Sequence, residues 1–222
     1  MNIPKIAEAF EKFVKNEAIV AIGTSEYDSV FLDELIKLIL ISKKKIYFVP
    51  TTSKQATQLH SLGQSVISLS DKEIDVAIEF CSQADSFNNF IKNDTKSFIR
   101  DKMIAQSALN LIVVVNDYNF IEKIDKDVYV EISSFAWERT ILNLQSYGLA
   151  RVVKDTDDNF VKTETGHYLA RIAIDKNISL DDFEYSVRNI PGVLETGAFL
   201  GLTETFFVIN NKDEITIKMR RS

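Results

Sequence analysis

The spacing of apolar residues is the feature that most constrains the fold of this 222-residue chain. Short runs rich in β-branched residues, such as LIVVV at residues 111–115, alternate through the first half with segments whose apolar residues recur at helical intervals. Parallel strands need a crossover connection, usually a helix, and helices on both faces make such strands apolar throughout. The pattern therefore predicts a parallel sheet covered by helices on both faces.

The expected elements can be placed along the first 125 residues. Helical spacing predicts helices at residues 6–13, 30–41, 51–63 and 98–109. Apolar runs predict strands at residues 19–22, 46–49, 66–69, 76–80 and 111–115. The first strand is followed by a turn of small residues and a helix, an arrangement that can bind phosphate at the helix N-terminus.

The pattern changes after residue 125. Strands are expected at residues 128–133, 150–153, 168–174 and 193–200, and helices at 135–147 and 179–189. Two last strands, at residues 203–210 and 214–219, are expected to rejoin the first sheet. We therefore predict an α/β protein. Residues 1–125 and about 203–222 form a Rossmann-like, mostly parallel sheet domain, and residues 126–202 form a smaller α+β, ferredoxin-like domain.

The charge balance excludes two classes of partner. The chain carries 32 acidic and 26 basic residues, a formal net charge of -6. Nucleic acids and anionic membranes require a concentrated basic surface. The basic runs at residues 43–45 and 220–221 are isolated, and we interpret them as solvated turns or tails. We expect neither a nucleic acid nor a membrane as partner.

Cysteine and histidine usage makes a metal site unexpected. A single cysteine, Cys81, excludes a disulfide within the chain, and the two histidines, His60 and His167, lack the spacing of metal ligands. The N-terminus lacks the apolar core of a signal peptide, and no apolar run is long enough to span a bilayer. We expect a cytoplasmic protein that binds no metal.

Ligands of open parallel sheets bind beyond the carboxyl ends of the strands. Four loops of this chain are expected at such ends. Their polar residues are Thr24, Ser25, Thr51, Thr52, Lys54, Ser82, Asp85, Lys92, Asp101 and Asn116. Hydroxyls, ammonium groups and carboxylates together suit a phosphorylated, polyhydroxylated small molecule. The alternative for each serine or threonine is a structural role, because such a residue after a strand usually caps the next helix.

The order of these loop segments matches a known pattern. The chain has GTSEY at residues 23–27, SQAD at 82–85, KNDT at 92–95 and RDK at 100–102. It resembles the ribose-5-phosphate isomerase A family over nearly its whole length. That family has GTGST, DGAD, KGGG and REK at the corresponding places. The segment NIPGVLETGAFL at residues 189–200 is also similar to the family and supports the fold more than the activity.

The resemblance implies an aldose–ketose isomerase of the non-oxidative pentose phosphate pathway, which interconverts ribose 5-phosphate and ribulose 5-phosphate through an enediolate. It implies no cofactor and a homodimer or homotetramer. Asp101 would move the proton, Lys92 would stabilise the enediolate, and Ser82 and Asp85 would stand where the family has two aspartates. The implied substrate-binding residues are Gly23, Thr24, Ser25, Thr51, Thr52 and Lys54.

Several positions depart from the family pattern. Ser82 brings no charge, Asp101 is one methylene shorter than glutamate, and residues 93–95 replace three glycines. Glu26 places an anion in the expected phosphate loop, and its effect depends on whether it points inward or outward. The alternative hypothesis is therefore a catalytically impaired homologue that acts as a sugar-phosphate-binding or regulatory protein.

Overall fold

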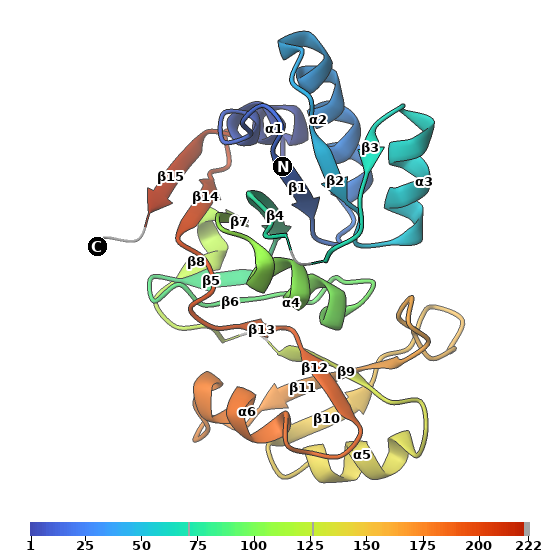
Figure 1. Ribbon diagram of the computed structural model, residues 1–222. Coiled ribbons are helices and arrows are strands. Elements are labelled where there is room, and N and C mark those ends of the chain that lie inside the picture. The colour runs from blue at the N-terminus through green and yellow to red at the C-terminus, as the bar shows by residue number, and fades with distance from the viewer. Residues whose placement is uncertain (71, 126, 220–222) are drawn as a thin grey trace.

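The computed structural model of the chain describes residues 1–70, 72–125 and 127–219. The basic pair Arg220-Arg221 and two of the predicted domain limits, residues 126 and 222, lie outside the described residues. Within the described part of the chain, no helix is both long enough and apolar enough to cross a membrane. Figure 1 shows a larger α/β body that holds the N-terminus and a smaller body built from the yellow and orange segments.

The larger body is built on a seven-stranded sheet with strand order β15-β14-β7-β4-β1-β2-β3. Its strands are β1 (Ile19–Ile22), β2 (Tyr47–Val49), β3 (Ser65–Val66), β4 (Val76–Phe80), β7 (Leu111–Asn116), β14 (Thr205–Ile209) and β15 (Ile215–Met219). All neighbouring pairs are parallel except β14 and β15. The mostly parallel sheet and the return of the last two strands are confirmed.

Helices cover both faces of this sheet. They are α1 (Ile3–Glu11), α2 (Asp28–Ser42), α3 (Ser53–Ser61) and α4 (Phe98–Ser107). Alternate residues of one strand face opposite ways, so Val20 of β1 packs in the core under α1 and α2, whereas Ala21 packs in the core under α4. Helix α4 therefore lies on the face opposite α1 and α2, as Figure 1 shows.

The smaller body has an antiparallel sheet with strand order β10-β11-β9-β12. Its elements follow the chain order β9 (Val128–Ile132), α5 (Trp137–Leu144), β10 (Gly148–Val152), β11 (Tyr168–Ile174), α6 (Leu180–Val187) and β12 (Val193–Thr196). This βαββαβ order is that of a ferredoxin-like unit. Helices α5 and α6 pack on one face, where Leu144 and Phe183 join the core of this body.

A third, short sheet lies between the two bodies and was not predicted. Its order is β13-β6-β5-β8, with β5 (Gln83–Asp85), β6 (Phe90–Ile91), β8 (Phe120–Ile121) and β13 (Ala198–Phe199). The expected strand at 193–200 is therefore split, because it leaves β9 and pairs with β6 beyond Gly197. A Cβ at Gly197 would lie 2.4 Å from the backbone oxygen of Lys92, so only glycine fits this crossing. The domain boundaries at 125 and 203 stay a prediction.

Other boundaries are shorter than expected. The predicted strand at 66–69 forms β3 only at Ser65–Val66, because its neighbour β2 has three residues and pairs with it at two positions. The predicted helix at 135–147 is confined to Trp137–Leu144. These differences leave the loops at the carboxyl ends of β1, β2 and β4 where the sequence placed them.

Helix α4 is tied to the smaller body by a buried ammonium group. Lys102 donates to Glu184 and Glu195, both at 2.9 Å, and to the backbone oxygen of Ala198 at 2.6 Å. These partners belong to α6, β12 and β13. The ion pairs therefore fix the position of α4. Asp101, the residue of α4 directly before Lys102, points into the candidate site.

We expect Lys102→Ala to lower the free energy of unfolding by roughly 3 kcal/mol. It removes the nearer cation of two mostly buried carboxylates and leaves them with the half-exposed Arg188, which lies 3.9 Å from Glu184 and 3.6 Å from Glu195. Urea unfolding monitored by circular dichroism measures the change. Lys37→Ala is the matched control, since Lys37 pairs with Glu34 at the exposed surface. Equal effects of the two substitutions would contradict this account.

Candidate functional site

The loop after β1 binds carboxylates of its own chain. The backbone N–H of Thr24 donates to Asp101 Oδ1 at 2.9 Å, and the backbone N–H of Glu26 donates to Asp94 Oδ2 at 2.5 Å. Amides of this kind are the groups that bind phosphate in strand–loop–helix sites. The loop is thus an anion-binding loop whose acceptors come from the segment after β6 and from α4.

Glu26 itself has an exposed side chain near the phenol of Tyr27. Burial, a hydrogen bond to Glu26 and the charge of Glu26 together raise the pKa of Tyr27 to about 12. The carboxylate of Glu26 is therefore directed toward solvent and Tyr27, and it is the carboxylate of Asp94 that binds the loop amide.

Beneath this loop lies a fully buried cluster of charged groups. The ammonium of Lys92 donates to the backbone oxygen of Thr24 at 2.9 Å, to Asp101 Oδ2 at 2.7 Å, and to Glu79. The side chains of Lys92, Glu79 and Asp101 are each 0% exposed. We call these three side chains the buried ion cluster.

Local sequence explains how each member is positioned. Lys92 follows β6, whose hairpin with β5 places it opposite Ser82. Asp101 stands in the first turn of α4, which Ser97 caps by accepting the backbone N–H of Arg100. Glu79 is the last residue but one of β4, every residue of which is buried. Strand, hairpin and helix therefore meet at the carboxyl edge of the sheet.

The hydrogen bonds of Asp101 show that its carboxylate is the best-satisfied anion of the cluster. It accepts from the N–H of Thr24 at 2.9 Å, the hydroxyl of Thr24 at 2.8 Å, the hydroxyl of Thr95 at 2.7 Å, and Lys92. Glu79 accepts from Lys92, and its Oε1 has no partner among the described residues.

The pKa values follow this difference. Burial, reinforced by the charge of Asp101, raises the pKa of Glu79 to about 8 against the opposing effect of Lys92. Burial also acts against the charge of Lys92, but the carboxylates of Asp101 and Glu79 outweigh it and raise its pKa. Burial therefore favours the neutral form of Glu79, while the neighbouring carboxylates favour the charged form of Lys92.

A groove of about 490 Å³ lies beside the cluster. It is lined by Ser25, Glu26, Asp28, Thr52, Lys54, Lys96, Lys162, Thr163 and Glu164. The N–H of Lys96 donates to the hydroxyl of Thr24 at 2.8 Å, so Thr24 and its neighbour Thr95 separate the groove from Asp101. We call this space the lysine groove, since its cations are exposed and suit a phosphorylated ligand.

Glu164 places a carboxylate at one side of the lysine groove. It accepts from the N–H of Ser53 at 2.7 Å and from its hydroxyl at 2.5 Å, at the N-terminus of α3, and Arg100 lies 3.3 Å away. Burial acts in the opposite direction, but these hydrogen bonds and the charge of Arg100 lower the pKa of Glu164. The carboxylate of Glu164, like that of Asp94, thus accepts a hydrogen bond from a backbone N–H that could otherwise bind an anionic ligand.

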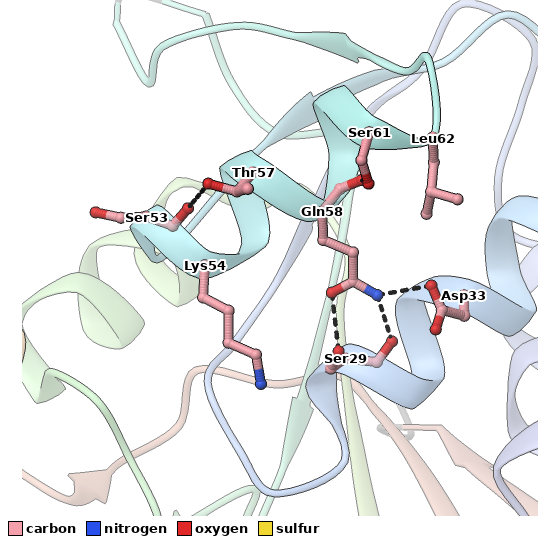
Figure 2. Close-up of a pocket in the computed structure, with 8 residues that line it drawn as sticks. All are labelled: Ser29, Asp33, Ser53, Lys54, Thr57, Gln58, Ser61 and Leu62. Carbon is pink, nitrogen blue, oxygen red and sulfur yellow. Dashed lines mark hydrogen bonds between the residues drawn. The ribbon is translucent and has the colours of Figure 1, made fainter.

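A second groove, of about 660 Å³, runs between α2 and α3 and shares Lys54 with the lysine groove. Figure 2 shows Gln58 reaching from α3 to Ser29 and Asp33 on α2. Its amide donates to the backbone oxygen of Ser29 at 2.8 Å and to Asp33 at 2.7 Å. The polar groups of this groove thus hold two helices together, and we place the candidate site in the lysine groove and the ion cluster.

The structure brings most of the sequence-predicted residues together. Thr24, Lys92 and Asp101 are in direct contact, and Gly23 packs against Glu79. Ser25, Thr52 and Lys54 line the lysine groove. The hydroxyl of Thr51 donates to the backbone oxygen of Ile22 at 2.7 Å, and that of Ser82 accepts from the N–H of Asn93 at 3.0 Å. Thr51 and Ser82 therefore shape the loops around the cluster.

Asp85 has a different environment. Its carboxylate accepts from the N–H of Phe87 at 2.8 Å and of Asn89 at 3.0 Å, at the turn of the β5–β6 hairpin. Ser82 and Lys92 lie at the opposite end of the hairpin, about 10 Å away at the usual rise per residue. These hydrogen bonds stabilise the turn. The predicted role of Asp85 at the sugar stays a prediction.

Five residues of the site were not identified from the sequence: Glu79, Lys96, Lys162, Thr163 and Glu164. Glu79 had a signal, since it is the charged residue in the apolar run VAIEF. Lys96 follows the Lys92 motif but carries no pattern of its own. Lys162 and Glu164 come from the connection between β10 and β11 and reach the groove only through the tertiary fold. Among the described residues, no group of three or more metal-binding side chains is placed to hold a metal ion.

Comparison with known proteins decides the family. The family model for ribose 5-phosphate isomerase A (phosphoriboisomerase A) matches residues 47–213, well over half of the chain. The chain belongs to the ribose 5-phosphate isomerase A family. It is 30% identical over 211 residues to ribose-5-phosphate isomerase A of Prochlorococcus marinus, covering 91% of this chain and 89% of that protein. The family resemblance is thereby confirmed.

Further relatives of the ribose 5-phosphate isomerase A family agree in length and fold. Ribose-5-phosphate isomerase A 1 of Oceanobacillus iheyensis is 26% identical over 215 residues, 96% of each chain. The solved ribose 5-phosphate isomerase of Plasmodium falciparum has a TM-score of 0.88 at 20% identity and covers 99% of both chains. A D-ribose-5-phosphate isomerase solved in complex with phospho-erythronic acid has a TM-score of 0.88 at 23% identity. These structural likenesses confirm the fold.

The close packing of Gly23 against Glu79 yields a test of the cluster. A Cβ at Gly23 would lie 1.8–2.2 Å from the carboxyl group of Glu79, which is buried and held by Lys92. We expect Gly23→Ala to be destabilising in the wild type and much less so in a Glu79→Ala background, with a coupling energy of about 1–3 kcal/mol. Urea unfolding of the four proteins measures it, and additive effects would contradict the packing.

Proposed function

We propose that this chain interconverts ribose 5-phosphate and ribulose 5-phosphate by proton transfer through an enediolate. The observation that carries the proposal is the direct contact of the Lys92 ammonium with the Asp101 carboxylate beneath Thr24. This contact lies at the carboxyl edge of a parallel sheet, where such folds bind ligands. Membership of the ribose 5-phosphate isomerase A family supports the same reaction.

The proposed chemistry needs one base and one cation. Asp101 takes the proton from C2 of the open-chain aldose and returns it to C1, while a hydroxyl proton passes from O2 to O1. The product is the ketose isomer, with no net gain or loss of atoms or electrons. Lys92 stabilises the oxyanion of the enediolate between the two proton transfers, and a preorganised cation in a site without water does this effectively.

The burial of both groups defines how the sugar must enter. Asp101 is covered by the hydroxyls of Thr24 and Thr95, and both threonines are buried. We infer that sugar hydroxyls replace these two threonine hydroxyls at Asp101 when the loop at residues 93–96 moves. The lysine groove then receives the phosphate, since Lys54, Lys96 and Lys162 are its cations.

The complex of a related fold with phospho-erythronic acid is consistent with a phosphorylated sugar-like ligand for this chain. We also propose that the chain works in the cytoplasm, without a cofactor, as a homodimer or homotetramer. Exposed apolar side chains on and beside α5, Phe135 at 85% and Leu142 at 58%, support self-association of this kind.

Asp101→Asn tests the assigned base. We expect it to lower the turnover of ribose 5-phosphate by at least about 100-fold, because the amide cannot accept the proton. Formation of ribulose 5-phosphate by the purified protein is the measurement, and Asp157→Asn, at an exposed turn, is the control. An unchanged rate would remove Asp101 from its role. A wild type that binds ribose 5-phosphate without turnover would instead favour the sugar-phosphate-binding alternative.

Glu164→Gln tests the assignment of the phosphate end. The amide oxygen still accepts from Ser53, but a negative charge leaves the lysine groove. We expect KM for ribose 5-phosphate to fall roughly threefold, with kcat little changed, as for removal of a solvent-screened repulsion. The effect should shrink as salt is added. A KM that is unchanged at low salt would place the phosphate elsewhere.

A further inference from the structure

Glu131 is a buried carboxylate that the proposed reaction does not use. It belongs to β9 of the smaller body and is 0% exposed. Its neighbours Val130 and Ile132 point into the core of that body. Alternate residues of a strand share a face, so Glu131 points the same way as Tyr129, which packs in the core under α4. Glu131 is therefore directed at the larger body, away from the core of its own.

Both oxygens of Glu131 accept hydrogen bonds, and each serves a different segment of the chain. Oε2 accepts from the hydroxyl of Ser97 at 3.2 Å and from the backbone N–H of Ile99 at 3.3 Å, at the start of α4. Oε1 accepts from the hydroxyls of Thr163 and Thr165, at 2.8 Å and 2.7 Å. Burial of a carboxylate is tolerated when its lone pairs are satisfied in this way.

These two segments carry the two ends of the candidate site. Asp101, the proposed base, lies in the first turn of α4, two residues after Ile99. Lys162 and Glu164, on either side of Thr163, line the lysine groove. Glu131 therefore lies between the base and the proposed phosphate end of the site, and it is joined to both without being in contact with the sugar.

The segment at residues 162–165 is held on two sides. On its exposed side, the N–H of Glu164 donates to the backbone oxygen of Lys96 at 2.8 Å, and its carboxylate binds Ser53 at the start of α3. On its buried side, Thr163 is only 5% exposed and its hydroxyl donates to Glu131. The position of this segment relative to α4 thus depends on Glu131 from below.

Resting on the function proposed above, we propose that Glu131 is a positioning residue that sets the distance between the base and the phosphate end of the site. It holds the first turn of α4 and residues 162–165 to one point of β9. A sugar phosphate whose phosphate lies in the lysine groove then presents C1 and C2 to Asp101. Inorganic phosphate needs the groove alone, so its binding does not depend on this distance.

Two uncharged substitutions of similar size separate the hydrogen bonds of Glu131 from its bulk and charge. Glu131→Gln can keep them, since its amide oxygen accepts from Ile99 and the two threonine hydroxyls can turn to accept from its NH2 group. Glu131→Met removes all of them. We expect Glu131→Met to lower kcat/KM for ribose 5-phosphate about 100-fold, as for a misplacement of about 1 Å, and Glu131→Gln to lower it less than about fivefold.

Binding of inorganic phosphate, measured by calorimetry, shows whether Glu131 acts through position. We expect its dissociation constant to differ by less than about threefold between Glu131→Met and the wild type, because flexible lysines bind it without a fixed geometry. A general loss of folded structure would weaken phosphate binding together with turnover, and that result would overturn the inference. Equal kcat/KM in Glu131→Met and Glu131→Gln would also overturn it.

Thr165→Val keeps the inference testable if Glu131→Met does not fold. Thr165 is exposed and is not among the residues that line the lysine groove. Its substitution removes one donor to Glu131, and we expect kcat/KM for ribose 5-phosphate to fall about threefold, the effect of one ordinary hydrogen bond. Thr216→Val, at an exposed position of β15, is the matched control. Equal rates in these two variants would contradict the proposed role.

Hydrogen exchange measured by mass spectrometry, without substrate, separates this inference from the proposed function. We expect faster exchange in Glu131→Met than in Glu131→Gln in peptides that cover residues 97–101 and in peptides that cover residues 163–167. Faster exchange in only one of these segments would overturn the inference whether or not the protein turns over ribose 5-phosphate. Faster exchange in both, in a protein without turnover, would remove the proposed reaction and support the link between the two segments.

Discussion

The burial of the Lys92 ammonium is the interaction on which the architecture of the site depends. An ammonium without water needs partners in three directions, and these come from the loop after β1, from β4 and from α4. The fold must therefore bring the loop after one strand, the carboxyl end of a second strand and the first turn of a helix to one point. Gly23 without a side chain and the capped start of α4 are local consequences of that requirement.

The departures from the family pattern form one connected set in space. Where the family has glutamate, Asp101 is shorter, and Thr95, in place of a glycine, donates its hydroxyl to it. Asp94, in place of another glycine, accepts the amide of Glu26 in the altered loop. Asp94 and Thr95 thus each contact a group that another substitution changed or left available. The substitutions are therefore better understood as a repacked site than as independent losses.

The sequence predicted what depends on local pattern and missed what depends on tertiary contact. Apolar runs were sufficient to predict the parallel sheet, because strands such as β4 and β7 are buried on both faces. The β5–β6 hairpin and the crossing at Gly197 have strands of two or three residues, too short to give a periodic signal. Motif order located Lys92 beside Asp101. It could not show that Glu164 reaches α3, since that contact depends on how distant segments pack. The turn that Asp85 caps is local, but the strands of two and three residues beside it give no periodic signal.

The groups that fill the site resemble the ligand that is proposed to replace them. The hydroxyls of Thr24 and Thr95 donate to Asp101, as sugar hydroxyls would. The carboxylates of Asp94 and Glu164 accept from backbone N–H groups that a phosphate would bind. Binding is then an exchange of hydrogen bonds of the same kind, and such exchanges contribute little net free energy. The affinity must come mainly from the lysines around the groove, while selectivity comes from how well a sugar reproduces the spacing of the two hydroxyls at Asp101. A ligand with phosphate alone would satisfy the first condition and fail the second.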